Sequence, residues 1–233
     1  MFVDNAIFNK QIQTKQKAVF DYRNKLMSSW ENLNIQGDIG NLSCLLLRPD
    51  IEATGIAVLL HPNPLHGGSN RNKVVQTAAK ALSNMGFLCV LPNLRGVGDS
   101  DGEHDYGNGE TSDVISVINY FRILYPSLAD NLLLGGFSFG GYVSCRTAHL
   151  IDIQHLLLIG AAVSKYEETA PLIPDNLKHK TLFIHGADDE VVQLKQVLDW
   201  CGIQDLSVVV VPNATHFFHG KLYALADAIK RFL

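Results

Sequence analysis

The stretch 132–141, Leu-Leu-Leu-Gly-Gly-Phe-Ser-Phe-Gly-Gly, decides the fold of this chain. A short apolar run typical of a buried strand leads into a Gly-x-Ser-x-Gly turn, and a segment compatible with a helix follows. In that context the spacing indicates a serine on a sharp turn, with its hydroxyl pushed out above a sheet. Side chains two residues before or after Ser138 would collide, which explains Gly136 and Gly140. The alternative is that Ser138 only caps the helix.

The composition is that of an ordinary globular protein. The chain has 233 residues, of which 47% are hydrophobic, and a formal net charge of −4. That length suffices for one α/β domain with a full core, and the charge gives no reason to expect binding to nucleic acid. No apolar run reaches the length that crosses a bilayer, and the N-terminus lacks the features of a signal peptide. We therefore expect a cytoplasmic protein.

The cysteines and histidines indicate no metal centre. Four cysteines lie far apart without a Cys-x-x-Cys pair, so we interpret them as small buried hydrophobic residues. His61 and His66 are five residues apart in a proline-rich loop, without the helical spacing of zinc sites. We expect neither a metal ion nor another cofactor.

From about residue 40 the chain alternates short apolar runs with longer amphipathic runs. The expected strands are Leu42–Leu47, Ile56–Leu60, Phe87–Leu91, Leu132–Leu134, His155–Ile159, Thr181–His185 and Leu206–Val211. The expected helices are Asn72–Met85, Thr111–Tyr125, Phe139–Leu150, Val191–Cys201 and Phe218–Phe232. This alternation predicts an α/β fold with a mostly parallel sheet covered by helices on both faces. The segment Leu42–Leu47 is expected to pair antiparallel with a strand near Leu33–Gln36.

Residues 1–30 differ from the rest and are treated as an N-terminal helical arm, with the main domain at 31–233. The arm is polar and rich in lysine, and Ile12, Val19 and Leu26 recur every seven residues as a helical stripe. One interpretation is a helix laid across the domain body. The other is a lid over the site or a dimerisation arm, which would make the protein a homodimer.

Polar residues that follow two further strands complete a catalytic set, since ligands bind at the carboxyl ends of parallel strands. Asp189 follows Thr181–His185 and precedes the next helix; its neighbour Asp188 is the rival, and either could be only a helix cap. His216 follows the last strand, where an imidazole can take a serine proton and return it to a leaving group. A carboxylate in the neighbouring loop would orient that imidazole.

An oxyanion hole needs two backbone N–H donors. One is expected from Phe139, directly after Ser138 at the start of a helix. The other is expected from the loop after Ile56–Leu60, where Pro62 and Pro64 have no N–H and leave Asn63 as the early donor. His61 is interpreted as a support for this loop.

Three stretches together resemble the α/β-hydrolase superfamily over nearly all of residues 35–233. They are residues 61–68 (His-Pro-Asn-Pro-Leu-His-Gly-Gly), residues 93–102 (Asn-Leu-Arg-Gly-Val-Gly-Asp-Ser-Asp-Gly) and the Ser138 turn. The particular similarity is to a small, minimally capped bacterial group related to dienelactone hydrolases. The resemblance implies a mostly parallel sheet of about eight strands, and the superfamily order of nucleophile, acid and base in Ser138, Asp189 and His216. Arg95 is then an organiser of its loop.

The chain also departs from that group. Its long N-terminal arm is one difference, and Asn63 stands where the group often has histidine. Dienelactone hydrolases use a cysteine nucleophile, whereas this chain has Ser138. Only about twenty residues separate Ile159 from Thr181, room for a loop and one short helix containing Tyr166, so we expect an open site. Candidate substrate-binding residues are Leu65, Phe137, Tyr166 and Phe217, with Phe139 also near the site.

These features predict a serine hydrolase that cleaves an ester or thioester of a small molecule through an acyl-enzyme. A peptidase or amidase using the same triad is one alternative; we find no acidic or basic clamp that would grip a peptide. A hydrolase fold kept only for binding a partner is the other, because fold does not dictate function.

Overall fold

Residues 30–166 and 170–233 are described by the computed structural model. They form one eight-stranded sheet in the order β1-β2-β4-β3-β5-β6-β7-β8. The strands are β1 (Glu31–Gly37), β2 (Gly40–Leu47), β3 (Gly55–Leu60), β4 (Phe87–Pro92), β5 (Leu132–Phe137), β6 (His155–Ile159), β7 (Thr181–Gly186) and β8 (Val208–Val211). The helices are α2 (Lys73–Ser83), α3 (Asn108–Leu124), α4 (Phe139–Thr147), α5 (Asp175–Lys178), α6 (Leu194–Gly202) and α7 (Leu222–Phe232), with 3₁₀ turns η1 (Pro64–His66) and η2 (Pro126–Leu128).

The sheet is mixed. Strands β3 to β8 run parallel to one another, whereas β2 is antiparallel to both β1 and β4. In the β1–β2 pair Leu33 lies opposite Cys44, which confirms the expected antiparallel partner of Leu42–Leu47. Every residue of β3, β4 and β5 is buried. Continuous apolar strands of this kind arise where helices cover both faces of a sheet.

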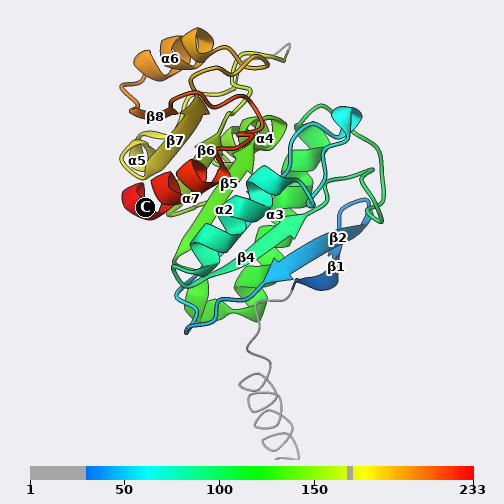
Figure 1. Ribbon diagram of the computed structural model, residues 1–233. Coiled ribbons are helices and arrows are strands. Elements are labelled where there is room, and N and C mark those ends of the chain that lie inside the picture. Colours follow the sequence, from blue (N-terminus) through cyan, green and yellow to red (C-terminus); the bar gives the residue numbers. More distant parts are fainter. Residues whose placement is uncertain (1–29, 167–169) are drawn as a thin grey trace, which may run out of the picture.

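Helices form a layer on each face of the sheet (Figure 1). The buried side chains of α2 and α7 belong to one hydrophobic cluster. Those of α3, α4 and α6 belong to the other, on the opposite face. Each helix therefore buries one stripe against the sheet, as the amphipathic segments of the sequence predict. Among the described residues, none of the helices has the length and apolar character that a bilayer crossing requires.

Two helices begin later than the sequence predicts. Helix α6 begins at Leu194 and not at Val191, because the amides of Val191 and Val192 donate to Oδ1 of Asp189 and form a separate turn. Helix α7 begins at Leu222 and not at Phe218. Phe218 itself has a φ of 52°, outside the helical region, so the segment before α7 is a tight turn.

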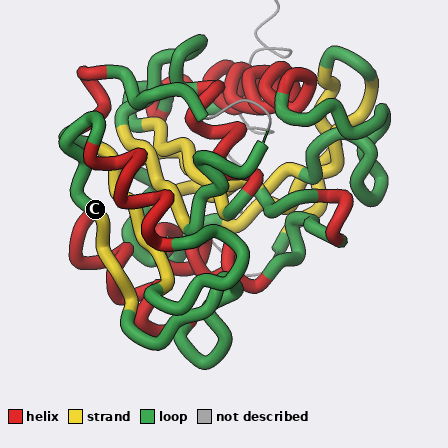
Figure 2. Tube along the Cα trace, turned by 90° about the horizontal axis from the view of Figure 1, so that it is seen from above, coloured by secondary structure: helices red, strands yellow, loops and turns green. Residues whose placement is uncertain are grey.

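The carboxyl ends of the parallel strands meet at one edge of the sheet. Figure 2, which views the molecule from above Figure 1, shows the loops and turns that cover this end. Between β6 and β7 the described residues contain only the four-residue helix α5, which confirms the minimal cap. The expected short helix therefore lies at 175–178 and does not contain Tyr166. The N-terminal arm proposed at 1–30 falls almost entirely outside the described residues.

Candidate active site

The turn between β5 and α4 holds Ser138 in a strained conformation. Its φ of 54° and ψ of −113° lie outside the regions that non-glycine residues favour. The strain is held by backbone bonds on both sides: the amide of Ser138 donates to the carbonyl of Ile159 at 3.0 Å, and its own carbonyl accepts from Ala162 at 3.1 Å and Gly141 at 3.0 Å. Ser138 is thereby fixed at the end of the sheet, next to β6.

Both flanking glycines are required by close backbone contacts. A Cβ added at Gly136 would lie 2.2 Å from the carbonyl carbon of Gly140, inside the turn itself. A Cβ added at Gly140 would lie 2.3 Å from the carbonyl oxygen of Leu60 and 2.7 Å from that of His61. The second contact brings the start of α4 against the end of β3, so the Ser138 turn and the loop after β3 are packed directly together.

Asp189 and His216 form a buried hydrogen-bonded pair. His216 Nδ1 lies 2.8 Å from Oδ2 of Asp189, and the side chains are 2% and 0% exposed. Oδ1 of the same carboxylate accepts from the amides of Val191 and Val192 at 2.9 and 2.7 Å. The neighbouring Asp188 is exposed, so the carboxylate that contacts His216 is that of Asp189.

The surroundings keep the Asp189 carboxylate ionised. Burial alone raises the pKa of Asp189, but the hydrogen bond and charge of His216 and the amide of Val192 outweigh it, and the pKa is lowered below its ordinary value. An ionised carboxylate accepts the Nδ1–H of the imidazole. Nε2 of His216 is then the nitrogen free to act on a second group.

The His216–Asp189 pair lies near the ends of β5 and β6, where the Ser138 turn begins. The ring of Phe137, directly before Ser138, lies 4.7 Å from the imidazole of His216 between centroids. At Gly160, after β6, a Cβ would lie 3.5 Å from Oδ2 of Asp189 and 3.6 Å from Cε1 of His216. We expected Phe137 to line the substrate site, but its side chain is fully buried in the core and packs against the imidazole of His216.

Two residues that hold this pair were missed by the sequence analysis. The amide of His216 donates to Oε2 of Glu190 at 3.2 Å, which fixes the backbone of the histidine. His185 is fully buried, with Nε2 2.9 Å from the carbonyl of Val192 and 3.5 Å from Oδ2 of Asp189. Burial lowers the pKa of His185. Both residues are close to Asp189 in the sequence, which could have drawn attention to them. Neither belongs to a motif that predicts its role.

The two amides expected to form an oxyanion hole are both available. Asn63 is held on three sides: Oδ1 accepts from the amide of Leu65 at 2.9 Å, its carbonyl accepts from Gly68 at 3.0 Å, and Nδ2 donates to the Tyr166 hydroxyl at 3.4 Å. Within residues 30–166 and 170–233, neither the amide of Asn63 nor that of Phe139 has a hydrogen-bond partner. The Gly140 contact places their two backbone segments side by side.

His61 supports the loop after β3. It is fully buried, its Nδ1 lies 2.7 Å from the carbonyl of Pro62, and its Nε2 accepts from the amide of Leu94 at 3.1 Å. Burial lowers the pKa of His61 to about 4, the Pro62 carbonyl opposes this, and the nearby His104 adds to the lowering. The neutral ring therefore ties the loop after β3 to the loop after β4.

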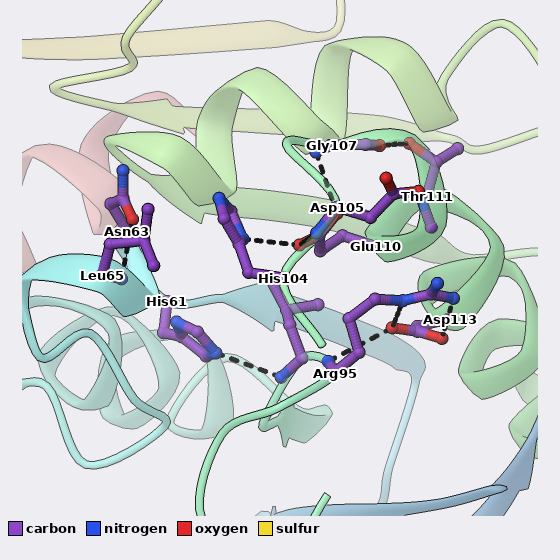
Figure 3. Close-up of polar contacts among 12 residues, drawn as sticks. His61, Asn63, Leu65, Arg95, His104, Asp105, Gly107, Glu110, Thr111 and Asp113 are labelled. Carbon is purple, nitrogen blue, oxygen red and sulfur yellow. Dashed lines mark hydrogen bonds and ion pairs between the residues drawn. The ribbon is translucent and has the colours of Figure 1, made fainter. Parts of the chain in front are cut away.

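Arg95 organises the loop after β4 (Figure 3). Its guanidinium donates to both carboxylate oxygens of Asp113 on α3, at 2.9 and 2.8 Å, and its amide donates to the same group. A Cβ at Gly109 would overlap the guanidinium, so the start of α3 packs directly on it. The arginine is almost fully buried, and its charge is paired with that of Asp113 inside the protein.

Three of the expected substrate-binding residues lie near these groups with exposed or half-buried side chains. Leu65 and Phe217 are exposed. Tyr166 is half-buried, and burial raises its pKa to about 12, so its phenol stays protonated. The rings of Phe139, Tyr142 and Tyr166 lie within about 6 Å of one another between centroids (5.5 Å for Phe139–Tyr166) and form an aromatic wall next to Asn63.

Known proteins share this fold and much of this sequence. Residues 58–161 match the family of the alpha/beta hydrolase fold. A structure of an alpha-beta serine hydrolase homologue from Coxiella burnetii is 37% identical, with 89% of this chain and 99% of that chain covered and a TM-score of 0.81. A serine hydrolase without a lid from Xanthomonas campestris is 34% identical, with 88% and 94% covered and a TM-score of 0.78.

A relative of unassigned function extends the same similarity. An uncharacterized protein of Rickettsia prowazekii is 32% identical over 192 residues, which are 76% of this chain and 78% of that protein. The chain belongs to the α/β-hydrolase superfamily. Its similarity to serine hydrolases supports a hydrolytic function for the site at the carboxyl edge of the sheet.

Proposed function

We propose that this protein is a serine hydrolase that cleaves a carboxylic ester or thioester of a small molecule through an acyl-enzyme intermediate. Ser138 is the nucleophile, His216 the general base and acid, and Asp189 the group that orients His216. The observation that carries the proposal is the buried 2.8 Å contact between His216 and Asp189, at the same edge of the sheet as the strained Ser138 turn.

In the first half of the reaction, His216 takes the proton of Ser138 at Nε2 while the serine oxygen attacks the substrate carbonyl carbon. The negative charge on the carbonyl oxygen is stabilised by the amides of Phe139 and Asn63, each of which is worth roughly 3–4 kcal/mol in such sites. His216 then gives its proton to the leaving alcohol or thiol. An acyl group remains bound as an ester of Ser138.

In the second half, water takes the place of the alcohol. His216 removes a proton from water as it attacks the acyl ester, and the same two amides hold the oxyanion. The bond between the acyl carbon and the Ser138 oxygen then breaks, His216 returns the proton to that oxygen, and the carboxylic acid leaves. Asp189 stabilises the imidazolium formed in both halves, because its lowered pKa keeps it ionised. We assign Leu65, Tyr166 and Phe217 to the substrate-binding surface.

A fluorophosphonate probe tests the proposal directly, since it labels only an activated serine. We expect labelling of the wild-type protein and none of Ser138→Ala. Ser116→Ala, a change on α3 away from the site, is the matched control and should label fully. Labelling of Ser138→Ala, or a folded wild-type protein that does not label, would contradict the proposal. Turnover of aminoacyl anilides equal to that of p-nitrophenyl esters would reassign it to amides.

A further inference from the structure

A second histidine–carboxylate pair lies beside the candidate active site, on the loop after β4. Nδ1 of His104 lies 2.7 Å from Oε1 of Glu110, although the two atoms are not aligned as a regular hydrogen bond. The side chains are 8% and 0% exposed. Nε2 of His104 is buried and has no hydrogen-bond partner within the described residues. A buried polar atom without a partner is costly, so it calls for an explanation.

The loop presents this histidine rigidly. The carboxylate of Glu110 accepts from the amides of Asp105 and Gly107 at 2.9 and 2.8 Å, and that of Asp105 accepts from the amide of Gly109 at 2.8 Å. The Arg95–Asp113 pair closes the same loop onto α3. Figure 3 shows His104 between the Asn63–Leu65 turn and Glu110, with its second ring nitrogen directed away from Glu110. A preorganised polar atom is what specific recognition requires.

His104 adjoins the proposed oxyanion hole. Its ring lies edge-on to Phe139, with 5.1 Å between the centroids, and Phe139 supplies one of the two proposed donors. Its charge also contributes to the lowered pKa of His61, in the loop that supplies the other donor. The imidazole of His104 is thus next to the side chain of one proposed donor residue and near the loop that carries the other.

We propose that His104 is a specificity-determining residue, whose Nε2 hydrogen-bonds a hydroxyl group carried by the acyl part of the substrate. The preferred substrates are then esters or thioesters of hydroxy acids. This inference rests on the proposed hydrolase function and adds the class of acyl group to it.

The charges around His104 favour a neutral hydroxyl. Residues 99–113 carry six carboxylates, Asp99, Asp101, Glu103, Asp105, Glu110 and Asp113, and the one arginine of the loop is paired with Asp113. A substrate carboxylate would meet these like charges. An ammonium group would have to lose its water beside the rings of Phe139 and Tyr106, which is costly. A hydroxyl both donates and accepts, so it suits the imidazole in either protonation state.

On this proposal, Tyr106 controls access to Nε2 of His104. Its ring lies 4.8 Å from that of His104 between centroids, and its side chain is 65% exposed. An exposed side chain changes rotamer on the picosecond-to-nanosecond scale. The incoming hydroxyl therefore reaches the buried nitrogen when Tyr106 turns aside, and it fills the hydrogen bond that the free protein lacks.

The experiment compares kcat/KM for p-nitrophenyl 3-hydroxybutanoate with that for p-nitrophenyl butanoate, which differ only in the hydroxyl. We expect the wild-type protein to prefer the hydroxy ester by roughly 10–100-fold. His104→Phe, which keeps the ring volume, should bring the ratio to about one. His104→Gln, which keeps a polar group, should retain part of the preference. His179→Phe is the matched control, an exposed histidine at the opposite edge of the sheet, and should keep the wild-type ratio.

Each result decides the proposal, with folding of the variants checked by thermal melting. A wild-type ratio near one, or a ratio that survives in His104→Phe, would overturn it. So would a stronger preference for the succinyl or 3-aminobutanoyl ester over the hydroxy ester. Fluorophosphonate labelling distinguishes failure of the hydrolase function from failure of the role of His104. A labelled wild-type protein without hydroxyl preference contradicts only the role of His104, whereas an unlabelled one contradicts the hydrolase function itself.

Discussion

The His216–Asp189 pair and the His104–Glu110 pair lie at one edge of the sheet, and they differ in what the carboxylate does. In the His216–Asp189 pair the contact is an aligned hydrogen bond of 2.8 Å. In the His104–Glu110 pair the atoms are 2.7 Å apart without such alignment. Asp189 orients an imidazole, whereas Glu110 mainly closes a loop through the amides of Asp105 and Gly107.

The difference shows that a short distance between histidine and carboxylate does not define a catalytic pair. What distinguishes His216 is its position beside the strained Ser138 turn and the second support of its backbone from Glu190. His104 has neither, but it has an unpartnered nitrogen near the proposed oxyanion hole. We therefore propose proton transfer for the His216–Asp189 pair and substrate recognition for His104.

The largest effect is expected from breaking the first pair. Asp189→Asn should lower kcat for ester hydrolysis by roughly 10⁴-fold, because an amide that donates to Nδ1 selects the wrong imidazole tautomer. Steady-state kinetics with a p-nitrophenyl ester measure the loss. Asp188→Asn, one residue away and exposed, is the matched control. A loss as large in Asp188→Asn, or none in Asp189→Asn, would mean that the pair has been misassigned.

A smaller effect, on stability and not on the chemical step, is expected from the second pair. Glu110→Gln replaces an oxygen that accepts an amide proton with a donor, so one buried amide of Asp105 or Gly107 loses its partner. The free energy of unfolding should fall by about 1–3 kcal/mol, measured by urea denaturation at neutral pH. Glu103→Gln, on the exposed part of the loop, should change it little. An unchanged value for Glu110→Gln would show that the loop is closed by other contacts.

An effect of similar size, but dependent on pH, is expected for His61, which has no carboxylate partner within residues 30–166 and 170–233 and so contrasts with both pairs. Its pKa is lowered to about 4 in the folded protein, so the unfolded chain binds its proton first as the pH falls. The free energy of unfolding is therefore unaffected by this proton above pH 6.5 and falls as the pH drops from 6.5 toward 4. The expected loss between pH 8 and pH 5 is about 2 kcal/mol. Urea denaturation across that range should show a shallower loss in His61→Gln than in the wild-type protein. Equal slopes would refute the assignment.

Much of the fold could be predicted because most of the parallel strands are short, mainly apolar runs. The Ser138 turn was equally visible, since its glycines are dictated by backbone contacts that no other residue allows. The starts of α6 and α7 could not be found, because the side chain of Asp189 and the positive φ of Phe218 interrupt segments with helical composition. Periodicity does not report such local bonds.

Site residues could be predicted where their place after a strand identifies them. They could not be predicted where the packing of the side chain determines their role. The choice of Asp189 and His216 followed from their positions after strands, and the structure places them in contact. Phe137 looked like a pocket residue because it adjoins Ser138, but alternation along β5 turns its ring into the core behind His216. His104 belongs to no motif. What distinguishes it is a buried ring nitrogen without a hydrogen-bond partner in the described part of the chain, which depends on packing and cannot be predicted from the sequence.

The contact at Gly140 has a consequence for redesign. Because the backbone of α4 packs on the carbonyls of Leu60 and His61, main-chain packing fixes the Ser138 turn against the start of the loop that carries Asn63. We therefore expect that exposed side chains near Ser138, such as Leu65 and Phe217, can be exchanged to accept new acyl groups without moving this backbone contact. The protein separates the part of its site that must not vary from the part that can be tuned.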